Sequence, residues 1–215
     1  MNSPHVVLLD NHDSFVYNLV DALAGYRTTV YRNSVSVAEV LASEPDIIVL
    51  SPGPGHPRDA GCMMELIDAT LGTIPILGVC LGFQALLEYH GGGVGPCGPV
   101  HGKSMPMTLT DAGTAHPVFA GLATDADPAQ PGVPGTQVPV ARYHSLGCTH
   151  VPTGMRVLAE TEADIGTIAM AAETDDGMAL GVQFHPESIL SPRGPDILDR
   201  FIYQLSTTPT MELKH

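Results

Sequence analysis

The first 90 residues alternate strand-like apolar runs with amphipathic segments, and this alternation constrains the fold more than any other feature. The strand-like runs are residues 5–10, 28–32, 46–51 and 75–79. The segments with helical spacing of apolar residues are 14–23, 35–43, 63–71 and 81–90. Uninterrupted apolar runs are typical of strands buried on both faces. A chain that repeats strand and helix in this order predicts a parallel sheet with right-handed crossovers and helices on both faces.

Beyond Gly91 the pattern changes to shorter segments that alternate apolar and polar residues. These segments are MPMTLT, TQVPVARYH, MRVLAE, GTIAMAAE and MALGVQFH. They predict antiparallel strands added at one side of the sheet. Residues 121–135 are predicted to form a surface loop and residues 195–205 a closing helix. The predicted fold is therefore α/β, with an open, mostly parallel central sheet, flanking helices and an antiparallel strand extension. We expect one domain over residues 1–206 and a fraying C-terminal tail over 207–215.

The excess of acidic over basic residues argues against some classes of binding partner. Nine Lys and Arg stand against 23 Asp and Glu, a formal net charge of −14. So few cations can hardly form the basic face that a nucleic acid or an anionic membrane requires, so neither is expected as a partner. The longest apolar stretch, IPILGVCLGF, is about half of a membrane span. Because the start lacks a basic, secretory type of segment, we expect a cytoplasmic protein with reduced cysteines.

Cys80 lies where a buried strand runs directly into a helix, with Gly78 and Gly82 two residues to either side. This is the thiol version of a nucleophile elbow, in which glycines permit a tight turn that presents the side chain at the carboxyl end of the sheet. The helix N-terminus favours a thiolate there, and backbone N–H groups after the turn are available to an oxyanion. The alternative for Cys80 is a buried, inert thiol. For the other cysteines, Cys62, Cys97 and Cys148, the inert interpretation is adopted.

A base and a group that orients it follow another strand-like run. In GVQFHPES the apolar residues end at His185, and Glu187 comes two residues later. Residues i and i+2 of an extended chain point the same way, so both side chains can face the crevice at the strand ends. Pro186 restricts the chain to that extended form. A thiol nucleophile needs such a pair, whereas a lone histidine in this place would be an ordinary solvated loop residue.

The turn SPGPGHP, residues 51–57, also follows a buried strand. It lacks the Lys and Ser or Thr of a phosphate-binding loop and is either a plain turn or a close backbone approach to a ligand at Gly53. The segment DNHDSF is interpreted as a strand end with Asp13 or Ser14 capping the next helix, and secondarily as part of a partner interface. His101, Lys103 and His144 show no spacing typical of metal ligands.

Six motifs occur together in the order and spacing of the class I (triad) glutamine amidotransferases, which this chain resembles from Val6 to about Leu205. Two of them, GxCxGxQ and HPE, mark the family, and two others resemble the glutamine-hydrolysing subunits of chorismate-using synthases. The motifs are DNHDSFVYNL (10–19), SPGPGHP (51–57), GVCLGFQ (78–84), HGK (101–103), RYHSL (142–146) and GVQFHPES (181–188). Phe83 stands where family members often have His or Tyr, and it is not expected to touch the triad.

The resemblance implies roles for individual residues. Cys80 would be the nucleophile, His185 the general base and then acid, and Glu187 the residue that orients His185. The backbone N–H groups of Gly53 and Leu81 would form the oxyanion hole. Lys103 would lie near the face that meets the synthase subunit. The residues implied to hold L-glutamine are Gly53, Pro54, Gly55, Leu81, Gln84, Ser145 and Leu146.

The resemblance also implies the reaction and the partner. The chain would hydrolyse the side-chain amide of L-glutamine and pass ammonia to a separate chorismate-binding synthase subunit, making anthranilate for tryptophan. It would need no metal, nucleotide or redox cofactor. Service to aminodeoxychorismate synthase, or to both enzymes, stays open. A cysteine peptidase or esterase with the same triad would leave Gln84 and RYHSL unexplained. A catalytically silent regulatory role disagrees with an intact set of Cys80, His185 and Glu187.

Overall fold

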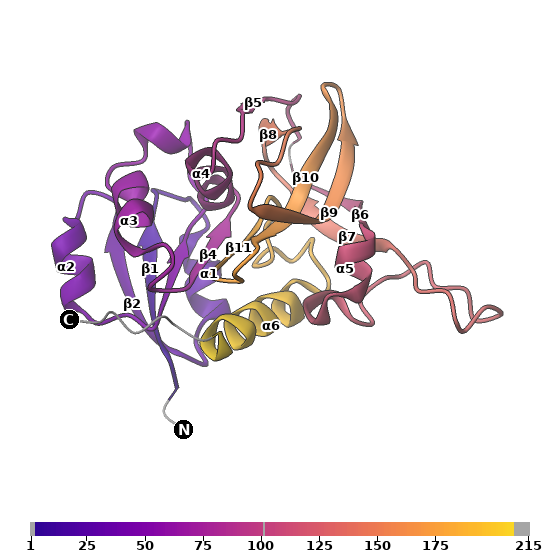
Figure 1. Ribbon diagram of the computed structural model, residues 1–215, viewed down its shortest axis with the longest axis horizontal. Helices are drawn as coiled ribbons and strands as arrows, with labels where there is room; N and C mark the ends of the chain where they lie inside the picture. The colour runs from indigo at the N-terminus through magenta and orange to yellow at the C-terminus, as the bar shows by residue number, and fades with distance from the viewer. Residues whose placement is uncertain (1–2, 101, 209–215) are drawn as a thin grey trace.

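A computed structural model describes residues 3–100 and 102–208. Within these residues the chain forms a nine-stranded mixed sheet with helices on both faces and a separate two-stranded sheet (Figure 1). The larger sheet has the strand order β2-β1-β3-β4-β11-β10-β9-β6-β7. The predicted α/β fold, with a mostly parallel centre and an antiparallel extension, is confirmed.

The parallel part of the sheet comes from the N-terminal half and one late strand. Its neighbours pair in parallel from β2 through β1, β3 and β4 to β11. The strands are β1 (His5–Asp10), β2 (Arg27–Arg32), β3 (Ile47–Leu50), β4 (Ile76–Val79) and β11 (Ala179–Val182). The helices are α1 (Val16–Ala22), α2 (Val37–Ala42), α3 (Met63–Thr70), α4 (Leu81–Tyr89) and α6 (Gly194–Thr207), with the short 3₁₀ turn η1 (Pro57–Asp59).

The antiparallel part begins at β11 and extends the sheet sideways. Here β11 pairs with β10, β10 with β9, β9 with β6, and β6 with β7. The strands are β6 (Lys103–Leu109), β7 (Gln137–Arg142), β9 (Met155–Ala163) and β10 (Gly166–Thr174). The small sheet joins β5 (Val94–Pro96) to β8 (Leu146–Cys148), and α5 (Asp111–Ala115) and η2 (Pro117–Phe119) follow β6.

Strand β1 explains why the sheet needs helices on both faces. Its residues are buried along the whole strand, and alternate side chains point to opposite sides. Val6 and Leu8 pack in the core shared with α1 and α6. Val7 and Leu9 pack in the second core, shared with α2 and α3. The strand's sequence is continuously apolar because both of its faces are covered.

The prediction was wrong about the last strand. The segment that includes β11 was assigned to the antiparallel extension, whereas β11 pairs in parallel with β4 and antiparallel with β10. All of its residues are buried, because it lies inside the sheet between β4 and β10 and joins the two parts. The sequence pattern also did not indicate β5, β8, α5, η1 or η2.

Two features that the sequence predicted, a surface loop and a C-terminal tail, can be compared with the described residues. The loop 121–135 extends away from the body beside α5, at the right of Figure 1. Helix α6 continues to Thr207, so the tail predicted at 207–215 begins on the last helical residue. Residues 209–215 of that tail, and His101, lie outside the described residues. The predicted domain limits stay a prediction.

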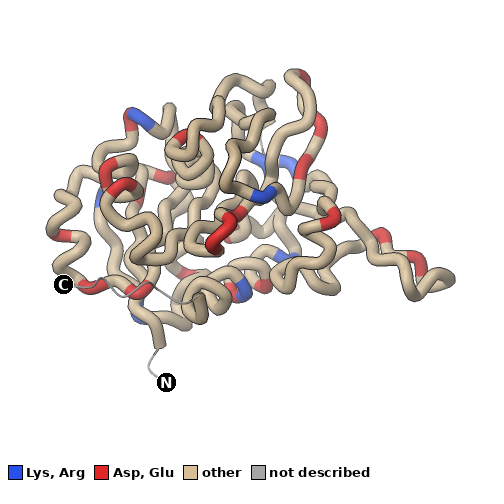
Figure 2. The backbone as a smooth tube through the Cα atoms, viewed as in Figure 1, with Lys and Arg blue, Asp and Glu red and all other residues tan. Residues whose placement is uncertain are grey.

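The surface carries few positive charges. Lys and Arg are spread among more numerous Asp and Glu (Figure 2). No helix among the described residues has the length and apolar character that crossing a membrane requires.

Candidate active site

Cys80 occupies the tight turn between β4 and α4. Its φ of 51° and ψ of −100° are rarely adopted by a residue with a Cβ atom, so the turn is strained. Two hydrogen bonds hold it: the Cys80 N–H donates to the Val182 carbonyl at 2.8 Å, and the Gln84 N–H donates to the Cys80 carbonyl at 3.0 Å. The predicted elbow is therefore present, at the carboxyl end of the central parallel strands.

Both glycines beside Cys80 are required by close backbone packing. A Cβ atom at Gly78 would lie 2.6 Å from the Gly82 carbonyl oxygen and 2.7 Å from the Phe83 nitrogen. A Cβ atom at Gly82 would overlap the backbone carbonyl of Leu50 on β3. Because backbone cannot move aside as a flexible side chain can, only glycine allows the turn to sit this close to the sheet.

His185 and Glu187 follow β11 and form a buried pair. The imidazole Nδ1 lies 2.6 Å from Glu187 Oε1, and the two side chains are 7% and 1% exposed. Burial disfavours the charged imidazole, but hydrogen bonding to Cys80 and Glu187 and their negative charges outweigh it and raise the pKa of His185 above its usual value. With Nδ1 bound to the carboxylate, Nε2 is the ring nitrogen left to exchange a proton.

One cavity of about 210 Å³ brings several predicted residues together. Cys80, His185, Gly53 and Pro54 all line it. Among the described residues, neither the Gly53 N–H nor the Leu81 N–H donates a hydrogen bond. Both groups are therefore unused hydrogen-bond donors within the described structure, and their role in an oxyanion hole stays a prediction.

The other residues implied to hold glutamine do not line this cavity. Gln84 is 3% exposed, and its Nε2 donates to the Leu146 carbonyl at 3.1 Å and to Gln183 Oε1 at 3.0 Å. Ser145 is exposed, and its carbonyl accepts the Cys97 N–H at 2.9 Å. Gly55 lies exposed on the turn with a φ of 82°. Contact of these residues with glutamine stays a prediction.

Gln183 is a site residue that the sequence analysis missed. Its side chain is fully buried, and its Nε2 lies 3.5 Å from the Cys80 sulfur. The oxygen of the same amide accepts from Gln84, so a chain of hydrogen bonds runs from the Leu146 carbonyl to the nucleophile. The signal was in the sequence, because residues 183, 185 and 187 alternate with apolar neighbours and share one side of an extended chain.

The segment 12–15 and Tyr143 also line the cavity, against expectation. The Tyr143 ring packs edge-on against His185, with 5.0 Å between ring centroids, and its hydroxyl lies 3.2 Å from Ser188 Oγ. The prediction that Asp13 or Ser14 caps α1 was wrong: the N-cap is Phe15, and no side chain caps this end.

Asp13 adds a carboxyl group to the wall of the site. Its Oδ2 is buried and has no hydrogen-bond partner among the described residues. Burial raises the pKa of Asp13 above its usual value, and the positive charge of His185 acts in the opposite direction. The site therefore holds a second carboxyl group near the imidazole besides Glu187.

The remaining histidine, lysine and cysteine candidates do not line the cavity at Cys80. His144 is buried: its Nδ1 lies 2.9 Å from the Leu146 carbonyl and its Nε2 accepts from Arg142 Nε at 3.2 Å. Burial, and next the charge of Arg142, lowers its pKa to about 4, so it stays neutral. Lys103 lies exposed at the start of β6. Burial raises the pKa of the thiols that were predicted to be inert, those of Cys62, Cys97 and Cys148.

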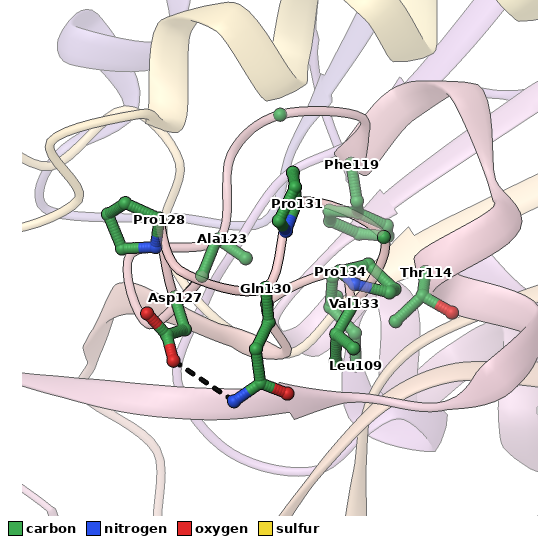
Figure 3. Close-up of a pocket in the computed structure, with 14 residues that line it drawn as sticks. Leu109, Thr114, Phe119, Ala123, Asp127, Pro128, Gln130, Pro131, Val133 and Pro134 are labelled. Carbon is green, nitrogen blue, oxygen red and sulfur yellow. Dashed lines mark hydrogen bonds between the residues drawn. The ribbon is translucent and has the colours of Figure 1, made fainter.

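Other places in the fold offer no comparable chemistry. The described residues contain no group of three His, Cys, Asp or Glu side chains that could hold a metal. A larger cavity, about 520 Å³, lies under the loop 121–135 and is lined mainly by proline, glycine and apolar residues (Figure 3). Its one titratable lining residue, Asp127, accepts a hydrogen bond from Gln130 at 3.0 Å. Within the described part of the chain, the reactive groups therefore gather around Cys80.

Proteins of several other organisms are similar to this chain. Anthranilate synthase component 2 of Corynebacterium glutamicum is 63% identical over 94% of this chain and 98% of that protein. The pyocyanine-specific anthranilate synthase component 2 of Pseudomonas aeruginosa is 42% identical over 90% of each. The crystal structure of a putative GMP synthase component from Thermoplasma acidophilum, 20% identical, superposes with a TM-score of 0.77 over 96% of both chains and shows the shared fold.

The family model for class-I glutamine amidotransferases matches residues 7–205. This match spans the elbow, the turn at Gly53 and the His185–Glu187 pair that surround the cavity. The chain belongs to the class-I glutamine amidotransferase family.

Proposed function

We propose that this chain hydrolyses L-glutamine through Cys80, His185 and Glu187 and supplies the ammonia to a chorismate-binding synthase subunit that makes anthranilate. The observation that carries the proposal is a single cavity lined by an elbow cysteine, a carboxylate-bound histidine and a turn with a free backbone N–H. The name shared by the curated relatives, anthranilate synthase component 2, supports the choice of synthase.

The first half of the reaction releases ammonia. The Cys80 thiolate attacks the amide carbon, and the resulting oxyanion accepts from the N–H groups of Gly53 and Leu81. The raised pKa of His185 keeps the imidazole protonated until the carbon–nitrogen bond breaks. Its Nε2 then gives a proton to the departing nitrogen, so that ammonia leaves and a γ-glutamyl thioester remains on Cys80.

The second half restores the enzyme. His185 is now neutral and takes a proton from water, and the hydroxide attacks the thioester carbon. The same backbone donors hold the second oxyanion, the carbon–sulfur bond breaks, and glutamate leaves. Glu187 keeps Nδ1 protonated and the ring oriented through both halves. Gln183, by donating to the sulfur, stabilises the thiolate before attack and after release.

The synthase subunit is needed because ammonia is the useful product. Chorismate is a dianion, and its binding site would need clustered Arg and Lys. This chain has nine such residues, and those among the described residues are interspersed with Asp and Glu along the backbone (Figure 2). We therefore place chorismate on the partner and glutamine on this chain.

The test measures glutamate release by the chain alone, with the anthranilate-forming synthase subunit, and with chorismate added. We expect slow release by the chain alone and acceleration at each addition, because docking can reorient the turn at Gly53; a bias of about 1.4 kcal/mol toward the competent state raises its share up to about tenfold. Anthranilate should form from glutamine in the last mixture. Equal release in all three mixtures would contradict the coupling, and release from peptides or esters in place of glutamine would contradict the substrate.

A further inference from the structure

We propose that Glu88 is a positioning residue for glutamine hydrolysis, because it ties the turn that carries Gly53 to helix α4. The contact would fix the spacing between the two backbone N–H groups that hold the oxyanion. This inference rests on the proposed function, since it concerns the donors assigned to Gly53 and Leu81.

The contact joins the end of the turn to the site's main helix. Glu88 Oε1 accepts a hydrogen bond from Arg58 Nε at 2.6 Å. Glu88 Oε2 lies 3.6 Å from Nδ1 of His56 and has no hydrogen-bond partner among the described residues. The Glu88 side chain is 10% exposed and that of Arg58 69% exposed. A nearly buried carboxylate on α4 therefore binds Arg58, which directly follows the turn in η1, and lies near His56 at the end of the turn.

The opposite end of the turn is held inside the sheet. Ser51 Oγ accepts the Asn11 N–H at 2.8 Å, and Asn11 Nδ2 donates to the Ser51 carbonyl at 3.0 Å. Between these two anchors Gly53 packs closely, since a Cβ atom there would lie 2.4 Å from the Asn11 carbonyl oxygen and 3.0 Å from Leu81 Cδ2. A Cβ atom at Gly55 would meet nothing within 4 Å. The turn is therefore open around Gly55, and the contact with Glu88 holds the chain on the far side of that opening.

Helix α4 carries the other half of the oxyanion site. Leu81 is its first residue, and Glu88 follows seven residues later, which is about two turns and the same side of the helix. Cys80 immediately precedes it. The hydrogen bond to Arg58 therefore positions the Gly53 turn against the same rigid element that holds the nucleophile and the Leu81 donor.

The expected consequence concerns rate more than stability. An ion pair with one exposed partner contributes little to folding. A displaced oxyanion donor, however, slows acyl transfer strongly, since small misplacements in a site have large effects on rate. We expect loss of the contact to lower kcat by about three- to tenfold, with KM for glutamine unchanged.

The experiment compares Glu88→Gln, Arg58→Ala and the double variant with wild type, each in complex with the synthase partner. Asp196→Asn is the matched control, because it removes a 2.8 Å ion pair to Arg193 on α6. Two probes separate an oxyanion effect from general disturbance. The Cys80 thiol adds to the aldehyde carbonyl of glutamate γ-semialdehyde, and the adduct is a tetrahedral oxyanion. Iodoacetamide forms a carbon–sulfur bond with the Cys80 thiol and releases iodide, and this reaction passes through no tetrahedral oxyanion.

We expect Glu88→Gln and Arg58→Ala to weaken semialdehyde binding by the same factor as kcat, while alkylation by iodoacetamide keeps its rate. The double variant should be no worse than either single variant, and Asp196→Asn should match wild type. Unchanged semialdehyde affinity in both single variants, or an equal fall in the alkylation rate, would overturn the role of Glu88. A wild-type complex that neither hydrolyses glutamine nor binds the semialdehyde would overturn the proposed function itself.

Discussion

In the parallel part of the sheet, strands β1, β3 and β4 are buried along their whole length. In the antiparallel part, β6 and β9 leave most of their residues partly or fully exposed. The parallel part brings its strand ends to one edge, where Cys80, His185 and the turn at Gly53 meet. The comparison indicates that the reactive groups gather at the strand ends of the parallel part, while the extension contributes Tyr143, which follows β7, to the wall of the cavity.

The largest expected effects come from substitutions of His185 and Glu187, and the two should differ in size. His185→Ala should lower glutaminase kcat on the order of 10³-fold or more, because no other group is placed to move the proton. Glu187→Gln should retain partial activity, because the amide still contacts the ring but no longer stabilises its charge. Steady-state glutamate release measures both. If His185→Ala kept the wild-type rate, the assignment of the base would be wrong.

A second prediction concerns the close glycine packing at the elbow of the parallel part. Gly82→Ala should destabilise the chain by about 1–3 kcal/mol and abolish most activity, because the new Cβ atom meets the Leu50 backbone. Gly132→Ala, in the loop 121–135, is the matched control, since its Cβ atom would meet nothing within 4 Å. Urea unfolding of both variants measures the difference. Equal midpoints would show that the elbow is looser than the geometry indicates.

The smallest predicted effect lies in the extension and leaves catalysis unchanged. Glu173 on β10 is buried, forms an ion pair with Arg156 and lies 3.2 Å from His116 Nε2. Burial alone would raise the pKa of Glu173, but these partners outweigh it and hold the pKa below its usual value. A carboxyl group with a lowered folded-state pKa stabilises the fold above its unfolded-state pKa, and the contribution is lost as pH falls through the folded-state pKa.

Glu173→Gln should therefore cost about 1–3 kcal/mol at pH 7 and less at pH 4 or below, with kcat near that of wild type. Urea unfolding at both pH values, together with glutamate release, tests this. A loss of stability that is the same at both pH values would contradict the ion-pair explanation. A large fall in kcat would contradict the division between the two parts of the sheet.

The sequence predicted the parallel part better than the extension for a physical reason. A strand covered on both faces is an unbroken apolar run, so β1, β3 and β4 are visible without knowledge of their neighbours. Strands β5 and β8 have three residues each and contain glycine, so no periodicity marks them. Strand β11 joins the two parts, and its parallel pairing with β4 depends on a tertiary neighbour that the local pattern does not contain.

The site residues likewise divide into those that local sequence patterns predict and those that tertiary contacts place. The positions of Cys80, His185 and Glu187 follow from local rules about turns and extended chain, and the structure brings them together as expected. Tyr143 and Asp13 reach the cavity from segments far apart in the sequence, through contacts that no local pattern encodes. The capping prediction for Asp13 or Ser14 was wrong because α1 begins later, at Val16, so that the N-cap position falls on Phe15, whose side chain cannot accept a hydrogen bond.

The most direct test of the account is Cys80→Ser in the complex with the synthase partner, assayed with glutamine and, separately, with ammonium salt. The hydroxyl group of serine is far less ionised at neutral pH, so glutamine-dependent anthranilate synthesis should fall on the order of 10³-fold or more. Synthesis from ammonium salt should continue at the wild-type rate, because the partner then receives ammonia without this site. Substantial glutamine-dependent synthesis by Cys80→Ser would contradict the central claim that this thiol releases the ammonia.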